Sequence, residues 1–194
     1  MTTTMNANYA NTQNQLLLNH LMEFYKQHEN LEKMMNIING ESKISLRIVD
    51  WFVTNYSKKY FVIYQLPVKN INGELEDIRF KVYNEYKLKL KAYSKRRFDP
   101  FCRWERITIP YDDSSSMETT IGQLNFFKWA IENRIIDYII ENYDMIEMDM
   151  NQRNSTSKIR ITDSVGTRKK REELSVSACK CIKKETVKIV VKFT

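Results

Sequence analysis

The stretch TIGQLNFFKWAIENRIIDYIIENY, residues 120–143, contains the clearest helical pattern in the chain. Apolar side chains recur along it at spacings of three and four, which places them on one face of a helix. They are Leu124, Phe127, Ile131, Ile135, Tyr138 and Ile139. Thr120 and Gln123 fit a capping box, in which the threonine oxygen accepts a backbone N–H and the glutamine side chain returns to the cap. We therefore predict a helix over residues 121–143 that lies in the hydrophobic core.

A second apolar stripe follows a Thr/Asn/Gln-rich segment, residues 1–13, whose composition predicts a disordered tail. The stripe repeats in steps of four and three, as in a heptad seam, and Gly40 after it suits a helix C-cap. It consists of Leu17, Leu21, Phe24, His28, Leu31, Met35 and Ile38. This spacing predicts one helix over residues 15–38. Its apolar face packs either on the chain's own domain or, apart from His28, against a second copy in a homo-oligomer.

Residues 45–57 also have helical spacing, and a hairpin is expected after them. Two segments rich in β-branched and aromatic residues, 60–69 and 74–83, flank the dipeptide Asn72-Gly73. Both turn residues tolerate positive φ, which predicts a β-hairpin. Pro67 suits an edge strand or a strand end, because it cannot donate to a ladder.

The segment YKLKLKA, residues 86–92, alternates strictly, and its spacing does not decide between strand and helix. A strand would place Lys87, Lys89 and Lys91 on one face, whereas a helix would scatter them.

Shorter patterns complete the expected fold. Residues 104–109 read as a strand, residues 110–118 as a loop, and residues 186–193 as a strand with one buried face. The fold class is thus predicted as α+β, with a small, mostly antiparallel sheet packed by long helices, plus a basic C-terminal arm.

The expected domain organisation follows from these elements. One α+β domain covers residues 14–153, a basic linker or arm covers residues 154–172, and residues 173–194 return to the sheet.

Charge is distributed unevenly around a formal net value of +7. Residues 81–103 carry eight basic and two acidic side chains, residues 111–153 carry three and nine, and residues 154–194 carry eleven and four. Two basic blocks around an acidic one suggest a polyanionic partner. The sequence has neither an apolar run long enough for a membrane span nor a secretory signal pattern, so we expect neither a membrane partner nor secretion.

Two stretches, YSKRRFDPFCR (93–103) and TTIGQLNFFKWAI (119–131), resemble a family of small proteins of nucleocytoplasmic large DNA viruses. The weaker stretch SLRIVDWFVTNY (45–56) fits the same family, and the resemblance covers residues 45–150. It implies that the protein is found in the host cytoplasm or in the virion, and it implies no activity and no site residues.

Basic and aromatic residues interleave between Lys81 and Trp104. Basic groups neutralise phosphates, and exposed aromatic rings stack on unpaired bases. A second basic cluster falls at Arg168–Arg171. The predicted nucleic-acid-binding residues are Lys87, Lys89, Lys91, Lys95, Arg96, Arg97, Arg103, Arg168, Lys169, Lys170 and Arg171. The alternatives are a solvated lysine edge whose aromatics turn into the core, and, for the second cluster, a solvated tail, an import signal or a contact with the acidic block.

No residue pattern predicts catalysis. Cys102 lies beside Arg103, which favours a thiolate, but no histidine is near it in sequence to act as a base. Cys179 and Cys181 lack the paired spacing of a zinc site. We therefore expect no enzyme activity, no metal site and no cofactor.

These observations favour a non-enzymatic, mainly sequence-independent nucleic-acid-binding protein of a large DNA virus, with DNA as the expected partner. The alternative is a virion structural or assembly protein that self-associates through its N-terminal helix.

Overall fold

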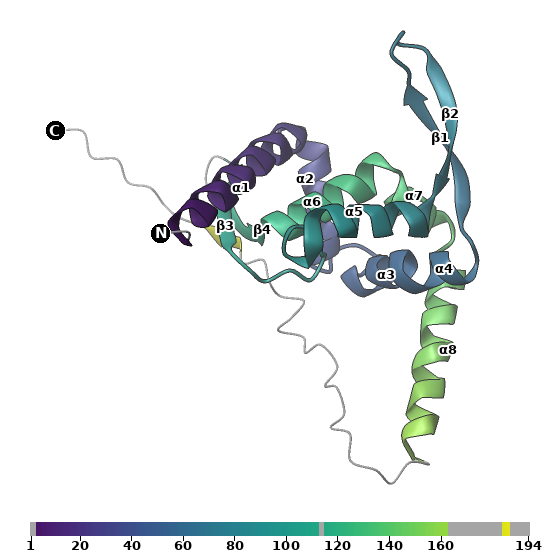
Figure 1. The fold of residues 1–194 in the computed structure, drawn as a ribbon. Coiled ribbons are helices and arrows are strands. Elements are labelled where there is room, and N and C mark those ends of the chain that lie inside the picture. The colour runs from purple at the N-terminus through teal and green to yellow at the C-terminus, as the bar shows by residue number, and fades with distance from the viewer. Residues whose placement is uncertain (1–2, 113–114, 163–183, 187–194) are drawn as a thin grey trace, which may run out of the picture.

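Helices and short antiparallel strands make up the computed structural model, which describes residues 3–112, 115–162 and 184–186 (Figure 1). The elements follow in chain order. They are α1 (Thr3–Tyr25), α2 (His28–Ile38), α3 (Leu46–Trp51), the π-helical turn η1 (Phe52–Tyr56), α4 (Ser57–Lys59), β1 (Ile63–Lys69), β2 (Leu75–Lys81), α5 (Val82–Arg97), β3 (Arg106–Asp112), β4 (Ser115–Thr120), α6 (Ile121–Glu132), α7 (Ile135–Glu141), α8 (Tyr143–Thr162) and β5 (Lys184–Thr186).

Helix α6 lies at the centre of the core, as its apolar pattern predicts, but the single helix expected over residues 121–143 is divided. The side-chain amide of Asn133 donates to the Trp129 carbonyl at 2.7 Å. Arg134, the next residue, adopts a left-handed conformation with φ of 54°. Asn142 repeats the side-chain bond on the Tyr138 carbonyl at 2.9 Å. The backbone N–H of each asparagine also donates to the same carbonyl, at 3.2 Å and 3.1 Å, so the side chain adds a second, local donor of the kind that asparagine supplies at turns. The two asparagines lie where the helix ends and resumes.

The N-terminus of α6 has half of the predicted capping box. The Thr120 hydroxyl accepts the Gln123 N–H at 3.2 Å, as a capping threonine should. The Gln123 side chain does not return to the cap, because its Oε1 accepts from the Thr119 hydroxyl at 3.3 Å and its Nε2 donates to the Pro100 carbonyl at 3.1 Å. This glutamine therefore ties α6 to a distant loop.

The N-terminal apolar stripe lies on two helices, because the chain turns at Lys26 and Gln27. The Tyr25 hydroxyl donates to the Leu124 carbonyl at 2.8 Å and fixes the end of α1 on α6. Four of the stripe residues are buried in the chain's own core. They are Leu21, Leu31, Met35 and Ile38. These four side chains therefore pack on the chain's own domain. Helix α1 begins at Thr3, so it includes residues for which the composition predicts a tail.

Helix α3, η1 and α4 run continuously through the predicted helix 45–57, with Ser45 as the N-cap. Asp149 of α8 fixes them to the next layer. Its buried carboxylate accepts hydrogen bonds from the Trp51 indole and the Tyr60 hydroxyl, each at 3.1 Å, and pairs with Lys59. The predicted linker starting at residue 154 is wrong in its first part, because α8 continues to Thr162 (Figure 1).

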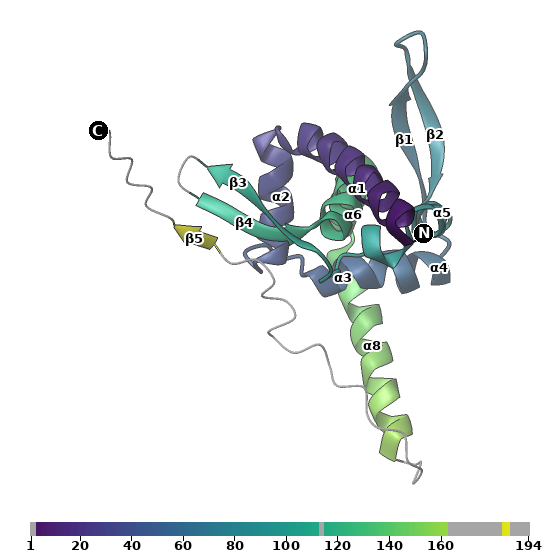
Figure 2. The same cartoon turned by 60° about the vertical axis from the view of Figure 1, so that its left-hand side comes forward.

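The predicted hairpin is confirmed as β1 and β2, which project away from the helices (Figure 2). Its turn differs in type from the expected one. Only Gly73 has a positive φ, of 82°, and its N–H donates to the Asn70 carbonyl at 2.9 Å. The Asn70 side chain accepts two further backbone N–H groups and closes the turn.

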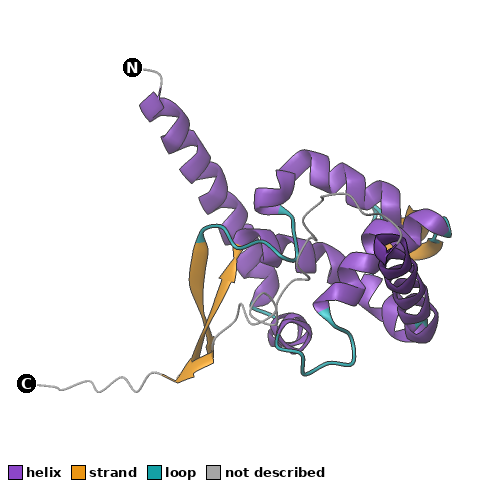
Figure 3. Cartoon of the chain, turned by 90° about the horizontal axis from the view of Figure 1, so that it is seen from below, coloured by secondary structure: helices purple, strands orange, loops and turns teal. Residues whose placement is uncertain are grey.

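Strands β3, β4 and β5 form a second antiparallel sheet, separate from the hairpin (Figure 3). The predicted loop 110–118 is mostly strand: β3 continues to Asp112 and β4 begins at Ser115. β5 pairs with β4 through Lys184–Thr186, and the rest of the predicted strand 186–193 lies outside the described residues. Helices with small antiparallel sheets confirm the α+β class.

The ambiguous segment 86–92 is helical, within α5. In the part of the chain that the structure describes, no helix is both long enough and apolar enough to span a membrane.

Candidate nucleic-acid interface

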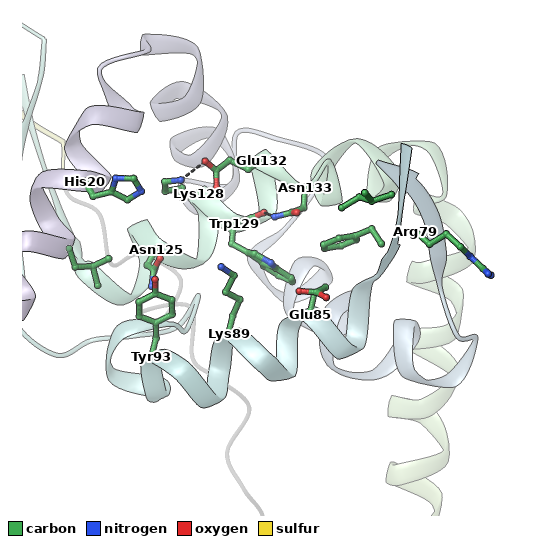
Figure 4. Close-up of a pocket in the computed structure, with 13 residues that line it drawn as sticks. His20, Arg79, Glu85, Lys89, Tyr93, Asn125, Lys128, Trp129, Glu132 and Asn133 are labelled. Carbon is green, nitrogen blue, oxygen red and sulfur yellow. Dashed lines mark hydrogen bonds and ion pairs between the residues drawn. The ribbon is translucent and has the colours of Figure 1, made fainter. Parts of the chain in front are cut away.

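Helix α5 divides the lysines that a strand would have aligned. Lys87 and Lys91 are four residues apart and share the exposed face of the helix. Lys89 lies on another side, towards α6 (Figure 4). The three lysines therefore do not form one basic row.

Lys89 lines a cleft of about 400 Å³ between α1, β2, α5 and α6. The cleft carries charges of both signs, with Lys89 near Tyr93 and Asn125, and Glu85 farther along α5 (Figure 4). Lys128, on its wall, is paired with Glu132 of the same helix. This mixture of charges does not favour a polyanion.

Basic side chains gather instead where α5 ends. A hollow of about 270 Å³ is lined by Lys95, Arg96, Asp99, Phe101, Cys102, Arg103 and Trp104. We call these residues the basic corner. The Trp104 indole is 66% exposed, and the Arg96 guanidinium lies over its ring at 5.5 Å from the centroid. In proteins that bind single strands, exposed aromatic rings stack on unpaired bases and nearby cations contact the phosphates.

The backbone of the corner is bounded by two unusual conformations. Ser94 has φ of 60° and interrupts α5, and Glu105 has φ of 50° just before β3. Left-handed backbone is unfavourable for residues other than glycine and is enriched at functional sites. Together the two residues redirect the chain so that the segment between them forms a compact loop.

The loop is fastened to the N-terminus of α6. The Asn125 amide donates to the Arg97 carbonyl at 2.8 Å, and the Thr120 hydroxyl donates to the Cys102 carbonyl at 3.4 Å. Gly122 makes the close approach feasible, because a Cβ there would lie 2.8 Å from the Cys102 Cβ. The stretches 93–103 and 119–131, which carry the viral resemblance, thus form one packed unit.

Two acidic groups lie close to this loop. Burial, and after it the nearby charge of Asp99, raises the pKa of Asp50 to about 6, while Lys95 opposes the shift. Burial likewise raises the pKa of Asp99, against the Phe101 N–H and Lys95. Asp99 itself lines the basic corner, so the hollow holds one carboxyl group beside its three cations.

The predicted site residues are therefore only partly brought together. Lys95, Arg96 and Arg103 share the basic corner, whereas Arg97 bonds the Gln13 side chain at 3.2 Å. Lys87, Lys89 and Lys91 lie farther along α5. The cluster Arg168–Arg171 lies outside the described residues.

The aromatic residues between Lys81 and Trp104 are also divided between the core and the surface. Tyr86 and Phe98 are buried in the core, as the alternative interpretation expects, and Trp104 is exposed. Trp104 was not among the predicted site residues. Its position beside a basic loop was the available signal.

The thiol of Cys102 is buried, and its Sγ contacts the Arg96 carbonyl at 3.4 Å, which gives it a packing role. Among the described residues, no group of three histidine, cysteine, aspartate or glutamate side chains could hold a metal ion.

Comparisons with known proteins give a family. Residues 1–180 match a family of unknown function (DUF7197). An uncharacterized protein of Acanthamoeba polyphaga mimivirus is 48% identical over 130 residues, which cover 64% of this chain and 48% of the relative. The chain thus spans about half the length of that relative, and no solved structure matches. A relative in a large DNA virus agrees with the resemblance noted in the sequence. The chain belongs to this family of unknown function.

Proposed function

We propose that the protein is a non-enzymatic nucleic-acid-binding protein of a large DNA virus, and that the basic corner holds single-stranded nucleic acid. The observation that carries the proposal is the exposed Trp104 ring, with Arg96 over it and Lys95 and Arg103 in the same hollow.

Each part of the corner has a distinct role in this proposal. Lys95 and Arg103 neutralise phosphates and release counterions, which makes binding sensitive to salt. Trp104 stacks on an unpaired base, and Arg96 supports the ring as a cation–π partner.

Stacking also explains why binding would be largely independent of sequence. Every base has a π-face, so an indole platform accepts any of them. A duplex keeps its bases stacked on one another and offers the corner only its phosphates. We therefore expect single strands to bind more tightly than duplexes of the same length.

The proposal can be tested by fluorescence anisotropy with a labelled single strand. A strand of roughly 15 nucleotides is long enough to cover one binding site. Trp104→Ala should weaken binding by about 1–3 kcal/mol, the usual contribution of a stacked base. That corresponds to a loss of affinity of roughly 5- to 150-fold. Binding of the matched duplex should change little.

Phe61→Ala is the matched control, because Phe61 is an aromatic residue exposed outside the corner. It should leave the affinity for the single strand unchanged. Equal effects of the two substitutions, or tighter binding of the duplex than of the single strand, would refute the proposal.

A further inference from the structure

A lysine-rimmed apolar surface lies where α4, β1 and α5 meet. A hollow of about 290 Å³ there is lined by Phe61, Ile63 and Tyr83, with Lys58 and Lys81 at its rim. The Lys58 ammonium lies 5.6 Å from the centre of the Tyr83 ring.

The surface continues along α5 through Asn84, which borders a second, open hollow. This hollow adds the exposed Leu88 and the lysines at positions 87 and 91. Among the described residues, neither hollow has an acidic side chain in its lining. We call Phe61, Ile63, Tyr83 and Leu88, with the four lysines around them, the lysine-rimmed surface.

Phe61 is the unusual residue of this surface. It is 82% exposed, and its backbone has φ of 51°, a conformation that is unfavourable for a bulky residue. An exposed phenylalanine held in an unfavourable conformation contributes little to the stability of a single copy. This combination indicates a contact made by the assembled protein.

An acidic surface with its own exposed apolar residues lies on α7 and α8. Ile140, Met145 and Met148 are each more than half exposed. The sequence from residue 135 to residue 152 contains five acidic residues and no basic one, and all but the buried Asp149 are exposed or half-exposed. Glu141 and Asp144, which are next in sequence to Ile140 and Met145, are exposed. Lys43 approaches Asp144 at 3.6 Å, in a solvent-exposed pair that contributes little.

We infer that two copies of the chain associate by placing the lysine-rimmed surface of one on the acidic surface of the other. Apolar residues on both surfaces supply contact area, and methionine adapts readily to a partner. The opposite charges favour this pairing over contact between like surfaces. The interface does not use the N-terminal stripe, and the inference is independent of nucleic-acid binding.

Sedimentation velocity on two variants tests the pairing. The first, Phe61→Asn with Lys87→Glu, disables the lysine-rimmed surface, and asparagine tolerates the backbone conformation at position 61. The second, Met145→Lys with Met148→Lys, disables the acidic surface. We expect the wild type to associate, less so at high salt, and each variant alone to be monomeric.

A mixture of the two variants provides the decisive result. Each variant retains the surface that the other has lost, so one intact pairing forms only between unlike chains. We expect an equimolar mixture to associate although neither component does. Thermal melts of both variants should stay at the wild-type values and so show that both are folded.

Three results would overturn the inference. The first is a wild type that remains monomeric up to about 100 μM, because its self-affinity would then be weaker than a Kd of that size. The second is association that survives in both single variants. The third is a mixture that stays monomeric. If the first variant unfolds, Lys87→Glu with Lys91→Glu at exposed positions replaces it in the same mixing experiment.

Discussion

Replacing Gly122 with alanine probes the contact that holds the basic corner on α6. The new Cβ would lie 2.8 Å from the Cys102 Cβ, 2.9 Å from its sulfur and 3.0 Å from the Arg96 carbonyl oxygen. Non-bonded carbon atoms prefer separations of roughly 3.5–4.0 Å. The loop must therefore move by several tenths of an ångström, and the carbonyl oxygen is backbone that cannot rotate away.

The magnitude is the difference between two opposing effects. Overpacking of this kind costs about 1–3 kcal/mol, whereas glycine to alanine within a helix gains up to about 1 kcal/mol. We expect a net loss of about 1–2 kcal/mol, which lowers the melting temperature by about 2–8 °C in a chain of this size.

Chemical denaturation and thermal melts of Gly122→Ala measure this loss. A double-mutant cycle with Cys102→Gly identifies its origin, because that change removes both side-chain atoms that the new Cβ would meet. The cost of Gly122→Ala should be smaller in the Cys102→Gly background than in the wild type.

The sign of the effect makes the prediction easy to refute. Without a close contact, alanine would stabilise the helix through its propensity alone. A melting temperature that rises in Gly122→Ala, or a cost that is unchanged by Cys102→Gly, would show that the loop does not pack on α6 as described.

Three further predictions concern stability. Thr120→Ala removes the α6 N-cap and a bond to the basic corner, and it should cost about 1–2 kcal/mol by denaturation, more than the cap substitution Ser45→Ala; an equal or larger cost at Ser45 would contradict this. Because burial and the charge of Asp99 raise the pKa of Asp50 to about 6, its carboxylate is unfavourable above that pH. Asp50→Asn should therefore stabilise the protein by ~1–2 kcal/mol near pH 7.5, which is less than the full pKa shift implies because solvent screens the charge. The gain should fade as the pH falls towards ~4, where the carboxyl group becomes protonated in both states. A gain that does not change with pH would be inconsistent with this origin. Burial opposes ionisation of Asp149, but its three hydrogen-bond donors keep its pKa below the ordinary value. Its contribution is therefore present above pH ~4 and lost as the pH falls through the folded-state pKa, so the cost of Asp149→Asn, about 1–3 kcal/mol, should shrink in acid melts; a cost that persists there would argue against the ionised carboxylate as its source.

Much of the fold could be predicted from the sequence, because its helices and hairpin have strong periodicity. The breaks could not be placed as easily, since Asn133 and Asn142 interrupt one apolar pattern without altering its spacing. Both side chains bond the carbonyl four residues earlier, a local contact that periodicity does not register. The alternating lysines were ambiguous for a similar reason, because tertiary packing decides between the two structures.

The candidate site was less accessible to sequence analysis. Lys95, Arg96 and Arg103 are near one another in the sequence and remain so in space, whereas the assignment of Lys89 to the same face depended on a strand that does not form. The close approach of Cys102 to Gly122 joins segments twenty residues apart. The only feature of the sequence that pointed to this close approach was a glycine inside a helical pattern.

The salt dependence of single-strand binding shows whether the basic corner contacts the phosphates. Lys95→Gln with Arg103→Gln removes two charges from the basic corner, and Lys87→Gln with Lys91→Gln removes two from the exposed face of α5. Each lost phosphate contact on a single strand reduces the slope of log K against log salt by about 0.7. We predict a reduction of about 1.4 for the first pair and none for the second. Equal reductions in both, or no binding by the wild type at about 50 mM salt, where phosphate contacts are strong, would contradict this prediction.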